Sequence, residues 1–198
     1  MNTKRAEIIE ATSHLMSAKG YADTSLSDIL TAAQIGKGQF YHYFPSKHEL
    51  GLAVVAQCTA WFEKHLFQEI LESPQAAEAK LNTMFDWLVA FHQKRTPGRG
   101  CFFGNMALEM SEHDEAFRLK LRHVFETWSH KIENVLHNMF QSRNVPPDDI
   151  RRLALTIVAM LEGGFLIMKN YRNLDVLRDI IKSILLLLDT YKQKYPQT

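Results

Sequence analysis

The chain has 198 residues, of which 46% are hydrophobic and 23% charged, and its formal net charge is +1. This composition is typical of a soluble globular protein and excludes a disordered or membrane-embedded chain. The small net charge gives no bulk attraction to nucleic acid, so DNA binding would depend on where the charges lie. Two cysteines, Cys58 and Cys101, are too few for a disulfide framework, and no signal-peptide pattern begins the chain. We therefore expect a cytoplasmic protein.

Apolar residues recur at spacings of three and four, and no alternating strand pattern occurs in the sequence. This periodicity predicts an all-α fold of about nine helices. The first helix is expected from Thr3 to Lys19, with Gly20 as its stop. A second, short helix follows, capped by Thr24 or Ser25, with an acid three residues after Ser25 as in a capping box.

The stretch from Lys37 to Phe44 reads Lys-Gly-Gln-Phe-Tyr-His-Tyr-Phe. It is too polar for a core segment and too aromatic for an ordinary solvent-exposed helix face. The three-residue turn Gln34-Ile35-Gly36 joins it to the preceding short helix, so the pair predicts a helix-turn-helix. Because Phe40 and Phe44 are four residues apart, we expect both to point inward and the other side chains of the stretch to point outward or sideways.

A long helix is expected next. Pro45 should end the short helix, because the residue before a proline is disfavoured in the α conformation. Ser46 with Glu49 predicts the capping box of a helix that continues to about Ile70, where Glu72-Ser73-Pro74 breaks the pattern.

The remaining chain predicts longer helices with large apolar faces. The expected elements are a helix around Leu81–Phe91, a loop from Arg95 to Gly100, a short helix over about Cys101–Met110, a long helix from Phe117 to Met139 capped by Ser111 with Asp114, and two last helices at Asp149–Asn170 and Leu174–Lys194. These last two helices are apolar around much of their circumference, and Gly163-Gly164 inside the first of them suggests a close helix approach. They predict a homodimer built as a four-helix bundle.

The first fifty residues resemble the N-terminal signature of the TetR family of one-component transcriptional regulators. The matching positions are Thr24, Asp28-Ile29, the turn into Lys37-Gly38, Tyr41-His42-Tyr43-Phe44 and Ser46-Lys47. The chain departs from the family pattern in the turn, at Gln34, Ile35 and Gly36. The resemblance implies a helix-turn-helix DNA-binding domain over residues 1–50 and a helical ligand-binding and dimerisation domain over residues 51–198. It also implies a repressor that a small-molecule or electrophile effector releases from a palindromic operator.

By this resemblance, the Lys37–Phe44 stretch would enter the major groove of double-stranded DNA. Gln39 and the Lys37-Gly38 pair would lie deepest, because an amide suits adenine and a lysine suits the acceptors of guanine. The residues implied to bind DNA bases or backbone are Thr24, Lys37, Gly38, Gln39, Tyr41, His42, Tyr43 and Lys47.

A regulated repressor needs an effector site, and the aromatic and methionine residues of the middle helices are candidates to line it. The predicted pocket residues are Trp61, Phe85, Phe91, Cys101, Phe102, Asn105, Met106, Glu109, Trp128 and Phe165. Most of these residues could equally belong to the core. Cys101 follows Arg99-Gly100 at an expected helix start, where the cation and the helix terminus favour the reactive thiolate. The other interpretation is a small buried apolar residue.

The sequence contains no P-loop, Gly-rich dinucleotide turn, Gly-x-Ser-x-Gly or His-Glu-x-x-His motif. His123, His130 and His137 are spaced by seven, which places neighbours about 10 Å apart along a helix, too far to share a metal ion. We therefore predict no catalytic residue, no cofactor and no metal site. The alternative functions are those of an all-helical small-molecule-binding protein or an enzyme without DNA binding.

Overall fold

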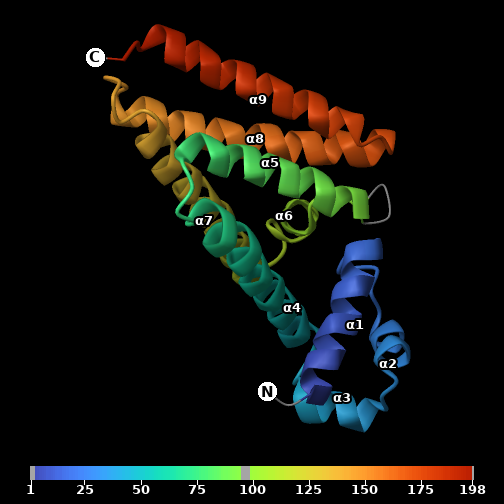
Figure 1. The fold of residues 1–198 in the computed structure, drawn as a ribbon. Helices are drawn as coiled ribbons and strands as arrows, with labels where there is room; N and C mark the ends of the chain where they lie inside the picture. The colour runs from blue at the N-terminus through green and yellow to red at the C-terminus, as the bar shows by residue number, and fades with distance from the viewer. Residues whose placement is uncertain (1–2, 95–98, 198) are drawn as a thin grey trace. The chain divides into compact units, whose positions relative to one another are not determined.

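The computed structural model describes residues 3–94 and 99–197. Within these ranges the chain forms nine α-helices, one π-helical segment and no strand (Figure 1), which confirms the predicted all-α fold. The chain divides into two compact units. The N-terminal unit comprises residues 1–62 and 102–124, and the C-terminal unit comprises residues 63–101 and 125–198.

The N-terminal unit begins with three helices whose bounds follow the predictions closely. Its helices are α1 (Thr3–Lys19), α2 (Leu26–Ala33), α3 (Lys37–Tyr43), α4 (Lys47–Phe62), α6 (Phe102–Met110) and the first part of α7 (Glu115–Met139). Gly20 ends α1 with a φ of +88°, a left-handed conformation that favours glycine.

The predicted capping box is complete at α2, and the Ser46 half of the predicted box is present at α4. The Ser25 hydroxyl accepts the backbone N–H of Asp28 at 3.1 Å, and the Asp28 carboxylate accepts the backbone N–H of Ser25 at 2.8 Å, so the capping box is complete. At α4 the Ser46 hydroxyl accepts the backbone N–H of Glu49 at 3.1 Å. A cap of this kind contributes about 1 kcal/mol to helix stability.

The start of α7 differs from the prediction. The Asp114 carboxylate, not the Ser111 side chain, accepts the backbone N–H of Phe117 at 3.0 Å. The backbone N–H of Ser111 instead donates to the carbonyl of Ala107 at the end of α6. The prediction that Ser111 caps α7 is therefore wrong, because α6 uses this residue for its own last turn.

Helix α4 runs past the predicted domain boundary at residue 50. Gly51 lies on its buried face, and a Cβ there would come within 2.6 Å of the Tyr21 ring and 2.8 Å of the Phe117 ring. Only glycine fits such an approach. Because Phe117 belongs to α7, the compact unit extends beyond the predicted domain of residues 1–50 and includes a segment that is distant in the sequence.

Beyond Phe62 the helix continues as the π-helical segment η1 (Glu63–Leu71). The helix predicted to reach Ile70 is thus continuous, but its hydrogen bonds change from the i→i+4 to the i→i+5 pattern. Leu66, Phe67, Ile70 and Leu71 are all buried. Their spacing suits either kind of helix, which explains why the sequence predicted a single α-helix.

The C-terminal unit contains two long helices that lie side by side (Figure 1). Its elements are η1, α5 (Ala77–Lys94), the remainder of α7, α8 (Pro147–Tyr171) and α9 (Asp175–Lys194). A Cβ at Gly164 of α8 would lie 3.3 Å from the Ile180 side chain of α9, which confirms a close helix approach. At Gly163 a Cβ would meet no described atom within 4 Å. The predicted loop from Arg95 to Gly100 lies partly outside the described residues.

None of the described helices combines the length and the apolar character that a membrane span would need.

Candidate nucleic-acid interface

The turn between α2 and α3 has the geometry that a helix-turn-helix requires. Gln34 ends α2 in the left-handed conformation with a φ of 52°, and its backbone N–H is directed to the carbonyls of Leu30 and Thr31. Ile35 is buried and anchors the turn. Gly36 is the N-cap residue of α3. The chain therefore reverses within the three residues that the sequence predicted.

Helix α3 is fixed by its two phenylalanines. Phe40 is 0% exposed and Phe44 is 2% exposed, with their ring centroids 6.1 Å apart. The Arg5 guanidinium lies 4.9 Å from the centre of the Phe44 ring. Full burial of a phenylalanine side chain contributes about 1.5–3 kcal/mol. The structure thus confirms both predicted anchors.

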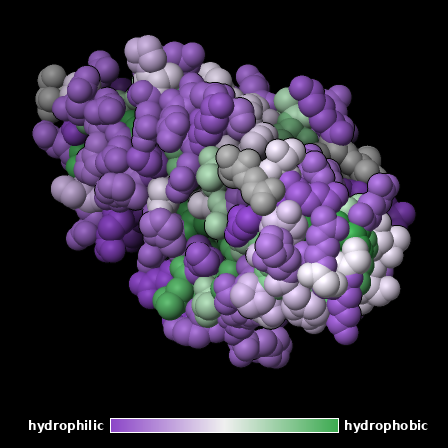
Figure 2. Space-filling view, turned by 90° about the horizontal axis from the view of Figure 1, so that it is seen from below, coloured by the Kyte–Doolittle hydropathy of each residue, from purple (hydrophilic) through white to green (hydrophobic). Residues whose placement is uncertain are grey.

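The other side of α3 is open to solvent. Its exposed residues are Lys37, Gly38, Gln39, Tyr41 and His42, and Tyr43 is half-buried. The aromatic side chains pack against one another in edge-to-face pairs. The ring centroids of Tyr41 and Phe40 are 5.2 Å apart, and those of His42 and Tyr43 are 4.9 Å apart. Figure 2, viewed from the side of the N-terminal unit where α3 lies, shows a mostly hydrophilic surface. The placement is as predicted, and the contact of these residues with DNA stays a prediction.

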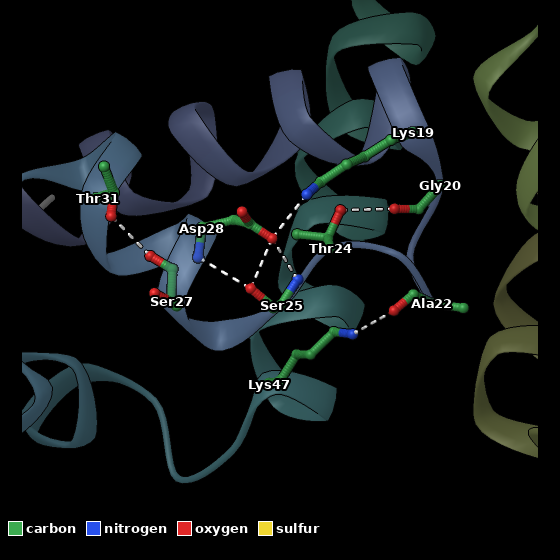
Figure 3. A network of polar contacts seen from close by, with 9 residues as sticks. All are labelled: Lys19, Gly20, Ala22, Thr24, Ser25, Ser27, Asp28, Thr31 and Lys47. Atoms are coloured by element: carbon green, nitrogen blue, oxygen red, sulfur yellow. Dashed lines mark hydrogen bonds and ion pairs between the residues drawn. The ribbon is translucent and has the colours of Figure 1, made fainter.

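Thr24 differs from the prediction. It is completely buried, and its hydroxyl donates to the Gly20 carbonyl at 2.6 Å (Figure 3). Its backbone N–H donates to the Tyr21 carbonyl at 3.2 Å. The Thr24 side chain therefore closes the loop between α1 and α2 and is not available to a phosphate in this conformation.

Lys47 lies against the same loop, at the start of α4. Its Nζ is 4.4 Å from the centre of the Tyr21 ring and 3.4 Å from the Ala22 carbonyl oxygen (Figure 3). Partial burial lowers the pKa of Lys47 below its usual value. The cation–π contact with Tyr21 fixes where this ammonium sits, so Lys47 is held in position before any ligand arrives.

Side chains of Lys19, Ser25 and Asp28 form a polar network at the N-terminus of α2. The Lys19 ammonium lies 2.6 Å from the Asp28 carboxylate, which also accepts from the Ser25 hydroxyl at 2.6 Å (Figure 3). The hydrogen bonds from Lys19 and Ser25 hold the pKa of Asp28 well below its usual range. Asp28 is therefore negatively charged at neutral pH and ties the end of α1 to the start of α2.

Glu109 on α6 also binds the α1–α2 loop. Its carboxylate accepts the backbone N–H of Tyr21 at 2.9 Å and also that of Ala22. A Cβ at Gly20 would lie 2.9 Å from a Glu109 oxygen, so glycine leaves room for the carboxylate. Glu109 was predicted to line an effector pocket, whereas in the structure both of its oxygens bind the loop backbone.

Helix α7 adds two contacts to the same region. The Asp114 carboxylate lies 2.8 Å from Nε2 of His48 on α4, and the Phe117 ring packs on Tyr21 at 5.0 Å. The backbone N–H of Phe117 and then the His48 side chain lower the pKa of Asp114. Helices α6 and α7 thus attach to the loop and to the start of α4, next to the residues predicted to bind DNA.

The other predicted pocket residues are divided between the two units. The N-terminal unit contains Trp61, Phe102, Asn105 and Met106, and the C-terminal unit contains Phe85, Phe91, Cys101, Trp128 and Phe165. Four of them, Phe85, Met106, Trp128 and Phe165, are buried core residues, whereas Trp61 is 43% exposed. The structure therefore does not bring the predicted set together within one unit.

Within the C-terminal unit, α5, α8 and the segment before α6 meet. The His92 ring of α5 lies 4.5 Å from the Phe165 ring of α8. Cys101 is hydrogen-bonded to the Glu162 side chain of α8. Burial raises the pKa of Glu162 to about 7, and the bond with Cys101 offsets part of that rise. Glu162 was not singled out from the sequence, although it is the one charged residue between Leu153 and Met168.

The described residues show no group of three or more His, Cys, Asp or Glu side chains suited to a metal ion. An open groove of about 470 Å³ lies on the N-terminal unit and contains none of the predicted pocket residues. It is lined by Glu7, Glu10, Ala11, His14, Leu15 and Ala32.

The fold and the exposed face of α3 define a helix-turn-helix regulator with a helical C-terminal unit. Known proteins agree with this class. Residues 8–54 match the family described as "Bacterial regulatory proteins, tetR family", and residues 77–183 match "Transcriptional regulator LmrA/YxaF-like, C-terminal domain". The chain therefore belongs to the TetR family of transcriptional regulators, and it is a DNA-binding regulator, as its N-terminal signature implied.

Individual relatives cover nearly the whole chain. The chain is 37% identical over 188 residues to an uncharacterized HTH-type transcriptional regulator from Lactococcus lactis subsp. lactis, covering 92% of each chain. It is 25% identical over 177 residues to the HTH-type transcriptional repressor DhaR of Mycobacterium sp. strain GP1, covering 87% of this chain and 86% of the relative. The crystal structure of a TetR regulatory protein from Rhodobacter sphaeroides superposes with a TM-score of 0.82 at 28% identity, covering 90% of this chain and 95% of that one.

Proposed function

We propose that this chain is a dimeric repressor whose two α3 helices bind the two halves of a near-palindromic operator, and that an effector releases it. The observation that carries this proposal is the division of α3 into buried phenylalanines and an exposed polar and aromatic face. The repressor DhaR among its relatives supports repression. That the named relatives are all regulators supports action by binding rather than by catalysis.

The roles of the exposed residues follow from their chemistry. Lys37 and Gln39 can reach base edges in the major groove, where each good contact gives about 1–3 kcal/mol of discrimination. A Cβ at Gly38 would meet no described atom within 4 Å, so packing does not require this glycine, and its small size would serve a close approach to DNA. Tyr41, His42, Tyr43 and Lys47 are proposed to bind phosphates, with Lys47 prepositioned by Tyr21.

The dimer is proposed to form through the outer faces of α8 and α9. Large apolar side chains are exposed there, Leu155 by 61% and Leu186 by 70%. Gly163 faces open space, in contrast to Gly164, which packs on Ile180. A second copy would cover the apolar residues and approach closely at Gly163, giving a four-helix bundle.

Genomic affinity selection of bound DNA tests this proposal. The expected result is an enriched site with two-fold symmetry, in which the two half-sites lie about one helical turn of DNA or somewhat more apart. The absence of an enriched site, or an enriched site without symmetry, would contradict a dimeric repressor.

The effector is proposed to be a small molecule, and specifically an electrophile that reacts with Cys101. Cys101 is half-buried rather than sealed in the core, and it directly precedes α6, whose Glu109 holds the α1–α2 loop. Treatment of the operator complex with N-ethylmaleimide should release wild-type protein. The Cys101→Ser variant should stay bound, while Cys58→Ser should behave like wild type. Release that persists in Cys101→Ser would remove Cys101 from effector sensing.

A further inference from the structure

Glu162 is a half-buried acid in an otherwise apolar stretch of α8. Its Oε1 atom is buried and accepts no hydrogen bond from any described residue. The carboxyl group is hydrogen-bonded to the Cys101 thiol. Buried polar atoms are normally satisfied, and an apolar side chain would fill this space without the cost of burying a carboxyl. The structure therefore gives Glu162 a position that packing does not explain.

Three segments of the C-terminal unit meet around Phe165, three residues beyond Glu162. On the segment before α6, Arg99 precedes Gly100 and Cys101. On α8, the aliphatic stem of Lys169 packs against Gly100, where a Cβ would lie 3.2 Å from it. On α5, the His92 ring packs on Phe165. The pKa of Glu162 is raised by burial and lowered by the Cys101 bond.

We propose that Glu162 takes up the proton of the Cys101 thiol when this thiol adds to a carbon electrophile such as an α,β-unsaturated carbonyl compound. The inference rests on the proposed role of Cys101 as the site of effector action. In this step the S–C bond forms while the C=C π bond opens, and the thiol proton moves to Glu162. The proton then passes, directly or through water, to the α-carbon, which regenerates the carboxylate. No oxidant or reductant is needed.

A base at this position predicts a particular pH profile. Only the ionised carboxylate can accept the proton, so the alkylation rate at Cys101 should rise through about pH 7 and level off there, below the pKa of about 8.5 of an ordinary thiol. A carboxylate with a purely structural role would act in the opposite direction. Its negative charge disfavours the thiolate, so its removal would speed the reaction.

The test measures N-ethylmaleimide addition to the full-length protein by mass spectrometry, between about pH 5 and about pH 9. Rates at Cys101 and Cys58 are read from the same sample, so Cys58 serves as the internal control. In Glu162→Gln, the Cys101 rate at pH 7 should fall at least about tenfold and should rise without a plateau as the pH increases. The Cys58 rate should not change.

An equal or faster Cys101 rate in Glu162→Gln overturns the proposal. If the Cys58 rate also rises, the variant is unfolded, and Glu162→Asp then decides: a plateau kept near pH 7 supports the base, and a profile without a plateau contradicts it. Operator release by the alkylated wild-type protein is measured separately. Alkylated protein that stays bound to DNA would refute the effector proposal and leave the proton transfer intact.

Discussion

At the scale of single residues, the roles proposed for Gln39 in base recognition and for Lys47 in phosphate binding predict different effects on DNA binding. Gln39 is exposed and lies one residue before the buried Phe40. We expect Gln39→Ala to relax specificity at one base position in each half-site, by about 1–3 kcal/mol, as measured by selection sequencing. Lys47→Ala is the matched control. It should weaken binding to all sequences alike and reduce the salt dependence by about one unit. An unchanged site preference in Gln39→Ala would remove Gln39 from base recognition.

The raised pKa of Glu162 also predicts how the stability of the folded chain changes with pH. Its pKa is about 7 in the folded chain, above its usual value of 4.5, so the folded state keeps a proton that the unfolded state releases. The stability contributed by the protonated carboxyl is complete below about pH 4.5 and is lost as the pH rises through about 7. Relative to Glu162→Gln, the wild-type free energy of unfolding should fall by up to about 3 kcal/mol over this range. Urea titrations at a series of pH values measure it, and parallel pH profiles of the two proteins would contradict burial of the carboxyl.

Single residues also show what a sequence can and cannot reveal about this site. Phe40 and Phe44 could be placed because helical spacing alone decides which side of α3 they occupy. Thr24 could not, because its burial depends on how the α1–α2 loop folds over Gly20. The contact of Glu109 with the Tyr21 backbone could not be predicted, because the two residues are 88 positions apart and no local sequence pattern indicates such a contact. Glu109 was therefore predicted to line a pocket.

At the scale of secondary-structure elements, α6 is attached to the helix-turn-helix through one carboxylate. Glu109→Gln keeps the size of the side chain but weakens its hydrogen bonds to the Tyr21 and Ala22 amides, which as charge-assisted bonds contribute about 1.5–3 kcal/mol when well shielded. We expect faster hydrogen exchange at these two amides and weaker operator binding. Glu112→Gln, an exposed acid just beyond α6, is the control and should change neither. Unchanged exchange at Tyr21 would mean that α6 does not hold the loop.

The elements themselves were predictable to different degrees. The bounds of α1, α2 and α3 could be read from Gly20, the Ser25 capping box and the Gln34 turn, because these signals act within a few residues. The change from α4 to η1 at Glu63 could not, since buried residues at three and four spacing suit both helix types. The association of α7 with α4 was equally hidden, because it depends on Gly51 meeting Phe117.

At the scale of the whole molecule, the charge balance of the helix-turn-helix bears on whether DNA binding needs a dimer. The first fifty residues contain five Lys or Arg and five Asp or Glu residues, so one helix-turn-helix has no net positive charge with which to attract DNA. Its contacts must come from placement, and two copies on one duplex bind as a linked pair, which can raise affinity about 100-fold to 10,000-fold over one copy. Operator binding should therefore require the dimer.

Gly163→Arg tests this requirement. The substitution places a charge on the outer face of α8, where a Cβ meets no described atom, so the protomer should still fold. In the dimer this charge would be buried without a partner, which should destabilise the dimer by about 3–5 kcal/mol. We expect analytical ultracentrifugation to show monomers and fluorescence anisotropy to show operator affinity reduced at least about 100-fold. Gly36→Arg adds the same side chain at another open position, in the N-terminal unit, and should leave the dimer intact. A monomeric Gly163→Arg protein that binds the operator as tightly as wild type would show that one helix-turn-helix suffices, because no other property of the variant could then supply the missing affinity.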